Sequence, residues 1–273
     1  MSGSHGILGL SDLGISELPG IQQFQMPGHV AVVTGGSKGL GLAMSAGLAS
    51  AGASLLLLSR HEAECTAAAK AVAEKFSVDA LGFEADVTEP DSLERAVAFA
   101  MNRWGKIDIL LNSAGINIRA PIEVLTHDQF DQVMKTNVYG TWNACKAVVP
   151  SMKQAGYGRI INISSALGVV GLPDRSSYAS SKGAIVQMTR TLGLELAPHG
   201  ITCNAICPGP FLTEINLPIA NSEQAKQQIL GLTAMKRWGE LKEIQGAAIY
   251  LASPASSYTT GSLLTVDAGW TAH

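Results

Sequence analysis

Residues 30–43 read Val-Ala-Val-Val-Thr-Gly-Gly-Ser-Lys-Gly-Leu-Gly-Leu-Ala. The apolar, β-branched run over 30–34 is typical of a buried strand, and the periodic apolar segment through Ala51 predicts a helix. Gly35, Gly39 and Gly41 lie at this junction. Glycines allow a tight turn and a close backbone approach to a pyrophosphate, which the free N–H groups of the helix N-terminus attract. The stretch predicts a dinucleotide site, although Gly-x-x-x-Gly-x-Gly is not the commoner spacing; the alternative is a glycine-rich turn without a ligand.

The rest of the chain alternates strand and helix patterns without internal repeats. The expected strands are 30–34, 53–59, 79–84, 107–112, 158–163, 201–206 and 263–266. The expected helices are 39–51, 61–76, 90–104, 127–154, 177–198, 222–230 and 240–252. Such alternation predicts a single doubly wound, Rossmann-type α/β domain, with a seven-stranded, mostly parallel sheet and helices on both faces. Ligands then bind outside the C-terminal strand ends.

The end of the second expected strand bears on the choice of cofactor. Ser59 and Arg60 stand there, and no acidic residue precedes Glu62. An acid at this place would hold the 2′-hydroxyl of NAD, whereas an arginine accommodates a 2′-phosphate. Lys38 in the glycine loop adds a second positive charge. We expect NADP(H) to be preferred over NAD(H); the alternative is that Arg60 only begins a solvated helix.

Tyr178 and Lys182 are four residues apart, which places them on one face of the helix expected over 177–198. A phenol has a reference pKa of about 10. A nearby ammonium stabilises phenolate and lowers that pKa towards neutrality, which suits proton transfer between an alcohol and a ketone. Such a pair by itself is common on solvated helix faces, so the interpretation depends on the motifs upstream.

Together these motifs make the chain resemble the classical short-chain dehydrogenases/reductases over about residues 28–272. The matching motifs, in the family's order, are Thr34–Gly41, Asp86-Val87, Asn112–Gly115, Asn137, Ser164-Ser165, Tyr178 with Lys182, and Pro208-Gly209 followed by Thr213. The resemblance implies a catalytic group of Asn137, Ser165, Tyr178 and Lys182. It implies a cofactor site formed by Gly35, Ser37, Lys38, Gly39, Leu40, Gly41, Ser59, Arg60, Asp86, Val87, Asn112, Ala114, Gly115, Tyr178, Lys182, Pro208, Gly209, Phe211 and Thr213.

Ser165 stands thirteen positions before Tyr178, the family's spacing for its catalytic serine. Its hydroxyl could stabilise the oxyanion as hydride arrives. Ser164 is the competitor, and because neighbouring side chains of a strand point to opposite sides, only one should be catalytic; we expect Ser165. In the family, the asparagine at Asn137 holds a water that links the lysine to solvent.

The chain departs from the family pattern at two places. Asn112-Ser113 stands where the family usually has two asparagines, and we expect a local change of hydrogen bonding there rather than lost activity. Val266-Asp-Ala-Gly-Trp270 replaces a usual Val-Asp-Gly-Gly. Ala268 would be strained in any backbone conformation with positive φ.

Composition narrows the function class. Of the 273 residues, 47% are hydrophobic and 15% charged, which predicts a large core. The net charge of −3 gives no footprint for nucleic acid. No apolar run reaches the roughly 18 residues of a membrane helix. The four cysteines form no Cys-x-x-Cys pair and the six histidines are scattered, so we expect no metal and a reducing cytoplasm.

Residues 1–27 form an extension outside the family core, and we expect the short-chain dehydrogenase/reductase domain over 28–273, with a substrate loop around 208–235. The extension lacks the basic start of a secretory signal. Its apolar series, Ile7, Leu8, Leu10, Leu13, Ile15, Leu18 and Ile21, is interrupted by glycines. It is either a flexible arm or an arm that packs on its own or a neighbouring subunit.

Within the family, the chain resembles gluconate 5-dehydrogenase-type sugar-acid reductases at residues 116–121, 166–171 and 205–214. Arg119 is a candidate partner for a carboxylate, or a solvated loop arginine. We expect an NADP(H)-dependent oxidoreductase that interconverts a ketone and a secondary alcohol, on a sugar acid, polyol or related small carbonyl compound. The alternatives are a 3-oxoacyl-thioester reductase and a non-catalytic dinucleotide-binding protein. Loss of the tyrosine, lysine or serine would favour the last, and all three are present.

The family also implies an assembly. Its members pack the helices expected at 127–154 and 177–198 against their symmetry mates, and use the last helix and strand, here 240–252 and 263–266, in a second interface. The second of these helices carries more apolar residues than one sheet-facing stripe needs: Ile185, Met188, Leu192, Leu194 and Leu196. Two isologous interfaces generate a closed homotetramer; the alternative is a dimer.

Overall fold

The computed structural model describes residues 18–214, 216–217, 220, 222–223, 227 and 229–272. Its sheet is formed by β1 (Val30–Thr34), β2 (Ser54–Ser59), β3 (Ala80–Glu84), β4 (Ile109–Asn112), β5 (Gly158–Ile163), β6 (Ile201–Pro208) and β7 (Leu263–Val266). The strand order is β3-β2-β1-β4-β5-β6-β7. Every neighbouring pair is parallel. The predicted single Rossmann-type domain is confirmed, with a sheet that is wholly rather than mostly parallel.

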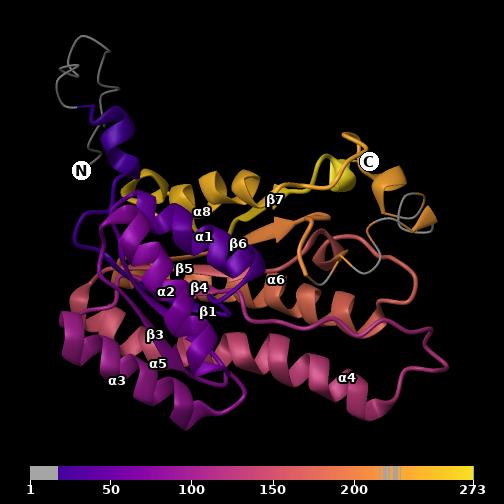
Figure 1. The fold of residues 1–273 in the computed structure, drawn as a ribbon, viewed down its shortest axis with the longest axis horizontal. Helices are drawn as coiled ribbons and strands as arrows, with labels where there is room; N and C mark the ends of the chain where they lie inside the picture. The colour runs from indigo at the N-terminus through magenta and orange to yellow at the C-terminus, as the bar shows by residue number, and fades with distance from the viewer. Residues whose placement is uncertain are drawn as a thin grey trace, which may run out of the picture.

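Helices cover both faces of this sheet (Figure 1). They are α1 (Gly39–Ser50), α2 (Glu62–Phe76), α3 (Pro90–Trp104), α4 (His127–Met134), α5 (Gly140–Ala155), α6 (Ser176–Leu196) and α8 (Gln245–Ala252). Alternate residues of a strand face opposite sides. In β1, Ala31 and Val33 pack with α1, α2 and α8. Val32, between them, packs with α3, α5 and the end of α6.

The long helix expected over 127–154 is interrupted by a π-helical turn. α4 ends at Met134, the π turn spans Lys135–Tyr139, and α5 begins at Gly140. The hydroxyl of Thr141 donates a hydrogen bond to the carbonyl of Asn137 at 2.7 Å, so a side chain satisfies a backbone acceptor inside the turn. Single π turns often occur at functional sites, and this one carries the predicted residue Asn137.

Other predicted helices differ at their ends. The helix expected over 240–252 begins as a 3₁₀ turn, Leu241–Ile244, and becomes α-helical at Gln245. The helix expected over 222–230 lies partly outside the described residues. None of the helices in the described part of the chain has the length and apolar character needed to cross a membrane.

Part of the N-terminal extension packs on its own domain. Met26 is fully buried, and its N–H donates to the carbonyl of Ala51 at 2.6 Å. The ring of Phe24 lies 6.4 Å from that of Tyr250 in α8. Leu18 and Ile21 are exposed. The earlier members of the apolar series, from Ile7 to Ile15, lie outside the described residues.

The strand order reverses between β1 and β4, which are neighbours in the sheet although β2 and β3 follow β1 in the chain. In such sheets the carboxyl ends of the two strands at the reversal border a crevice, which is the usual ligand site. The glycine loop follows β1, and Ser113 to Gly115 follow β4. The fold therefore brings the two segments together.

Candidate active site

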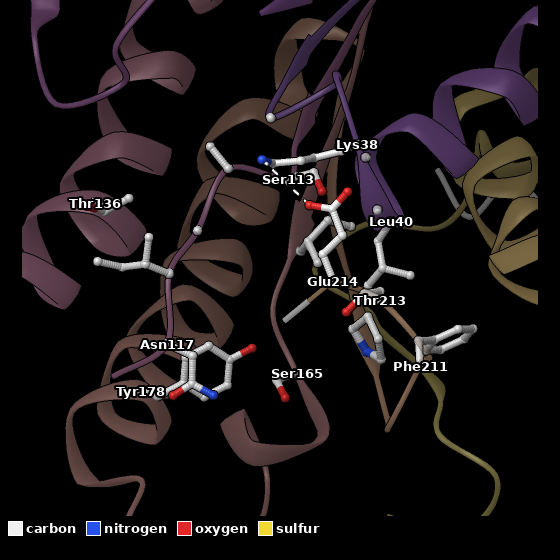
Figure 2. Close-up of a pocket in the computed structure, with 18 of the residues that line it drawn as sticks. Lys38, Leu40, Ser113, Asn117, Thr136, Ser165, Tyr178, Phe211, Thr213 and Glu214 are labelled. Atoms are coloured by element: carbon white, nitrogen blue, oxygen red, sulfur yellow. Dashed lines mark ion pairs between the residues drawn. The ribbon is translucent and has the colours of Figure 1, made fainter. Parts of the chain in front are cut away.

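A cleft of about 370 Å³ lies at this reversal point. Its walls come from the segments that follow β1 to β6 and from α6. Figure 2 shows Lys38 and Glu214 at one end and Tyr178, Asn117 and Ser165 at the other. The first end holds the glycine loop, and we call it the cofactor end. The second holds the predicted acid–base group, and we call it the substrate end.

The glycine loop has the geometry that a pyrophosphate site needs. Gly35 has a φ of +64°, and a Cβ there would lie 2.9 Å from the Cα of Ala114. A Cβ on Gly41 would collide with the carbonyl oxygen of Gly35. Lys38, at the N-cap of α1, makes no side-chain capping bond, so the first N–H groups of the helix remain available to an anion. These residues fit a bound dinucleotide.

The two cations predicted beside the glycine loop both line the cleft. Lys38 is exposed, and its Nζ lies 3.8 Å from a carboxylate oxygen of Glu64 and 3.6 Å from one of Glu214. Arg60 is exposed and also lines an adjoining hollow with Asp86. Sequence reasoning did not identify Glu64 and Glu214, because α2 and the segment after β6 bring them here.

Tyr178 and Lys182 lie on one face of α6, as predicted. The Lys182 Nζ is 5.6 Å from the centre of the Tyr178 ring and donates to the carbonyl of Ile163 at 2.7 Å. Only 5% of Lys182 is exposed. Burial lowers its pKa from 10.5 to about 8, an effect that the charge of Cys207 partly opposes.

The pKa of Tyr178 differs from the expectation. It is raised above 10, chiefly because burial penalises the phenolate. A hydrogen bond with Ser165 and the positive charge of Arg119 act in the other direction. The expectation that Lys182 lowers this pKa is therefore wrong for the structure described, in which burial dominates and Arg119 is the cation that acts on the phenol. Burial of Lys182 also favours its own neutral form.

The structure separates the two candidate serines. Ser164 donates its hydroxyl to the carbonyl of Lys182 at 2.9 Å and so fixes the end of β5 against α6. Ser165 accepts the N–H of Leu167 at 3.1 Å, which leaves its hydroxyl proton free, and it is the serine that interacts with Tyr178. This is the arrangement expected from the alternation of side chains.

Asn137 is fully buried and binds the segment after β4 to α6. It accepts the N–H of Ile116 at 2.8 Å and donates to the Ile116 carbonyl at 3.0 Å and to the Ser181 hydroxyl at 2.9 Å. A Cβ placed on Gly115 would lie 3.2 Å from its Oδ1 and 3.6 Å from the Nζ of Lys182. Asn137 therefore lies behind the cleft wall and close to the lysine.

Asn112 is the predicted cofactor residue that does not line the cleft. Its amide donates to Asn162 at 2.9 Å and to the sulfur of Cys145 at 3.3 Å, and only 2% of the residue is exposed. As the last residue of β4 it points into the core. The neighbouring Ser113, Ala114 and Gly115 line the cleft instead.

The remaining predicted cofactor residues share one property, that they line the cleft: Gly35, Ser37, Lys38, Gly39, Leu40, Gly41, Ser59, Arg60, Asp86, Val87, Ala114, Gly115, Tyr178, Lys182, Pro208, Gly209, Phe211 and Thr213.

Sequence reasoning missed several residues of the substrate end. Arg175, Asn216, Trp238 and Trp270 line the cleft. Arg119 donates to the Oδ1 of Asn216 at 2.8 Å, which links the segment after β4 to the segment after β6. Arg175 stands three residues before Tyr178, so that spacing could have identified it. In the described residues, no group of three or more His, Cys, Asp or Glu side chains is arranged to hold a metal ion.

Comparison with known proteins agrees with this geometry. A sequence profile described as enoyl-(acyl carrier protein) reductase matches residues 35–271. Gluconate 5-dehydrogenase of Gluconobacter oxydans (strain 621H) is 36% identical over 248 residues, which cover 91% of this chain and 96% of that protein. Galactitol 2-dehydrogenase (L-tagatose-forming) of Cereibacter sphaeroides is 39% identical over 251 residues, 91% of this chain and 97% of that protein.

A solved structure shows the same likeness. The gluconate 5-dehydrogenase from Burkholderia cenocepacia J2315, in complex with NADP and tartrate, is similar with a TM-score of 0.88 and 35% identity. The match covers 93% of this chain and 99% of that chain.

Proposed function

We propose a reaction for this chain, which belongs to the classical short-chain dehydrogenase/reductase family and is an NAD(P)-dependent dehydrogenase acting on a CH–OH group. The proposed reaction interconverts a ketone and a secondary alcohol, with NADP(H) as the preferred cofactor. The substrate we propose is a sugar acid, a polyol or a related small carbonyl compound. The observation that carries the proposal is a single cleft with the glycine loop at one end and Ser165, Tyr178 and Lys182 at the other.

Arg60 and the glycine loop support the choice of cofactor. The loop would hold the pyrophosphate, and Arg60 with Lys38 would face the 2′-phosphate. The related Burkholderia structure contains NADP. NAD(H) is the alternative, which the pairing of Lys38 with Glu64 and Glu214 would favour, because it reduces the positive charge offered to a 2′-phosphate. We also propose that the segment around 208–235 contributes to the substrate site, since its described residues Phe211, Asn216 and Ile229 line the cleft.

The residues of the substrate end divide the acid–base work. A bound nicotinamide supplies or accepts the hydride. Tyr178 donates its proton to the carbonyl oxygen during reduction, and the hydroxyl of Ser165 donates a second hydrogen bond to the same oxygen. Lys182 lies beneath the Tyr178 ring, and Asn137 anchors the backbone beside that lysine. Asn137 is thus a positioning residue.

The raised pKa of Tyr178 gives the two reaction directions opposite pH dependence. Burial keeps the phenol protonated at neutral pH, so the proton donor for reduction is already present. Oxidation requires the phenolate, whose population increases with pH. We therefore expect ketone reduction to be favoured near neutrality and alcohol oxidation to increase towards alkaline pH.

Replacement of Tyr178 by phenylalanine tests the proposal. General acid–base catalysis contributes about 10²–10⁴-fold, so kcat of Tyr178→Phe should fall by that order while the Kd for NADPH changes little. The control is Tyr258→Phe, because Tyr258 is fully exposed and does not line the cleft. Near-normal turnover of Tyr178→Phe would reject the assignment. A substrate panel of keto acids, ketoses and an acetoacetyl thioester separates the proposal from a 3-oxoacyl-thioester reductase, which would turn over the thioester best.

A further inference from the structure

Two arginines line the cleft together with Tyr178. Arg119 comes from the segment after β4, and Arg175 directly precedes α6. Both are half-buried, and neither forms an ion pair with a carboxylate in the described part of the chain. The acidic residues of the cleft wall are Glu64, Asp86 and Glu214. Glu64 and Glu214 pair with Lys38 at the cofactor end, and Asp86 borders Arg60. The charge facing the substrate end is therefore positive.

This concentration of positive charge is unfavourable without an anion. Burial lowers the pKa of both arginines, and the charge of Arg119 lowers the pKa of Arg175 further, while Asp174 acts against that change. Arg119 is close enough to Tyr178 to act on its pKa. A negative group between the two guanidinium groups would relieve both the desolvation and the mutual repulsion.

Both side chains are held in place with donors to spare. Arg119 donates one hydrogen bond to Asn216, whose amide donates to the carbonyl of Phe211 at 2.9 Å. Arg175 donates one bond to the carbonyl of Asp174 at 2.9 Å. A guanidinium group carries five N–H donors in a planar fork that matches a carboxylate. Each arginine thus keeps donors for a ligand.

The backbone before Arg175 has an unusual conformation. Asp174 has a φ of +61°, in the left-handed region that non-glycine residues rarely adopt. Such conformations persist where the surrounding structure fixes them, and they are frequent at ligand sites. The turn at Asp174 places Arg175 at the N-cap of α6, one helical turn before Tyr178.

We propose that Arg119 and Arg175 form an anion subsite that binds a carboxylate of the substrate, with Arg175 as a specificity-determining residue. The inference rests on the proposed function and makes it narrower: the substrates are hydroxy acids and their keto acids rather than neutral polyols. A carboxylate held by these two arginines would direct the reacting carbon towards Tyr178, which lines the same cleft.

Binding of matched ligand pairs tests the subsite without turnover. The probes are D-gluconate against D-glucitol, and D-galactonate against galactitol, which differ in the carboxylate alone. Calorimetry is carried out on the full chain saturated with NADPH, because these probes have no ketone that NADPH could reduce and no turnover occurs. We expect at least one acid to bind the wild type about 10- to 100-fold more tightly than its polyol, the range expected for charge-assisted hydrogen bonds.

Substitutions then assign the preference to the two arginines. Arg175→Gln and Arg119→Gln should each remove most of the preference for the acid and leave the Kd of the polyol unchanged, and Arg175→Lys should restore part of it. In kinetics, the KM for the acid should rise more than kcat falls. Arg190→Gln is the matched control, since Arg190 is exposed on α6 and does not line the cleft. Unchanged NADP⁺ affinity and unfolding temperature show that each variant is folded.

The outcomes separate this inference from the proposed function. Equal binding of acid and polyol by the wild type overturns the subsite, and so does an equal loss of both ligands in Arg175→Gln. If the wild type oxidises polyols without preferring acids, the proposed reaction stands and the subsite is rejected. If acids bind preferentially but NADP(H) turnover is absent with every substrate of the panel, the subsite stands and the proposed reaction fails.

Discussion

Lys182 should cost the protein stability at neutral pH, and its replacement by methionine measures that cost. The side chain is 5% exposed and its pKa is lowered from 10.5 to about 8 by burial. This difference corresponds to about 3 kcal/mol of free energy spent on keeping the ammonium protonated in the folded state at pH 7. Methionine has a similar length and no charge, so Lys182→Met removes the penalty.

Part of the stability that Lys182→Met gains by removing the buried charge is lost again. The lysine donates to the carbonyl of Ile163 at 2.7 Å, and methionine leaves that carbonyl without this partner. A lost hydrogen bond from a charged donor costs about 1.5–3 kcal/mol. We therefore expect Lys182→Met to raise the free energy of unfolding at pH 7 by up to about 1.5 kcal/mol, or the unfolding temperature by up to roughly 3–6 °C. The variant should at the same time lose most of its activity.

The stability difference between Lys182→Met and the wild type should depend on pH in a definite direction. Below pH 8 the lysine is protonated in both the folded and unfolded states, and above pH 10.5 it is neutral in both. Between these values the unfolded chain binds more protons, so this site makes the wild type more stable as the pH rises. The stability advantage of Lys182→Met should therefore be largest below pH 8 and shrink towards pH 10.

Thermal and urea unfolding at pH 7, 8, 9 and 10, at one protein concentration and without cofactor, measures the difference between the two proteins. Lys153→Met is the control, because Lys153 is exposed on α5 and lies outside the cleft. The reasoning is refuted if Lys182→Met is less stable than the wild type at pH 7, or if its advantage does not change with pH.

Three further predictions concern the cofactor, the backbone and assembly. Arg60→Ala should raise the KM for NADPH by roughly 10-fold or more and that for NADH much less, because only NADPH carries the 2′-phosphate; a wild type that prefers NADH contradicts this. Ala268 has a φ of +57°, so Ala268→Gly should raise the free energy of unfolding by about 0.5–1 kcal/mol in calorimetry, and a lower stability would show that the position is not strained. Light scattering should give four times 28.5 kDa; twice that mass would indicate the dimer and the single mass would reject assembly.

The fold could be predicted closely because its signals are local. Seven apolar strand patterns appear in the structure within one or two residues of their expected ends, since buried parallel strands tolerate few polar residues. The π turn at Lys135–Tyr139 could not be predicted, because 127–154 is apolar-periodic throughout. Asn137 in that turn forms hydrogen bonds with Ile116 and Ser181, which are far away in the sequence.

The candidate site was predictable where each motif is a short, continuous stretch of sequence. The glycine loop, Ser165, Tyr178 and Lys182 all line the cleft. Motif position does not reveal side-chain direction, and the end of β4 turns the Asn112 amide towards Asn162 and away from the cleft. The expected effect of Lys182 on Tyr178 was wrong because helical spacing gives proximity but not burial, and burial has the larger effect on both pKa values.

Assembly depends on surfaces that periodicity alone does not separate from the core. Of the apolar residues in α6, Ile185 and Leu196 are 1% exposed and belong to the core, whereas Leu194 is 79% exposed. In α5 and the turn before it, Trp142 and Tyr139 are 46% and 62% exposed. Large apolar side chains on two neighbouring helices favour burial against another subunit.

The proposed cofactor choice depends on four charged side chains from three separate segments. Arg60 alone would indicate NADP(H), and Lys38 in the glycine loop strengthens that reading. Glu64 and Glu214, however, lie within 4 Å of the Lys38 ammonium and reduce the field that it presents to a 2′-phosphate. These are exposed pairs, so a phosphate dianion competes with them at modest cost. Arg60 has no such ion pair in the described residues, so we expect the proposed preference for NADPH to depend chiefly on this side chain.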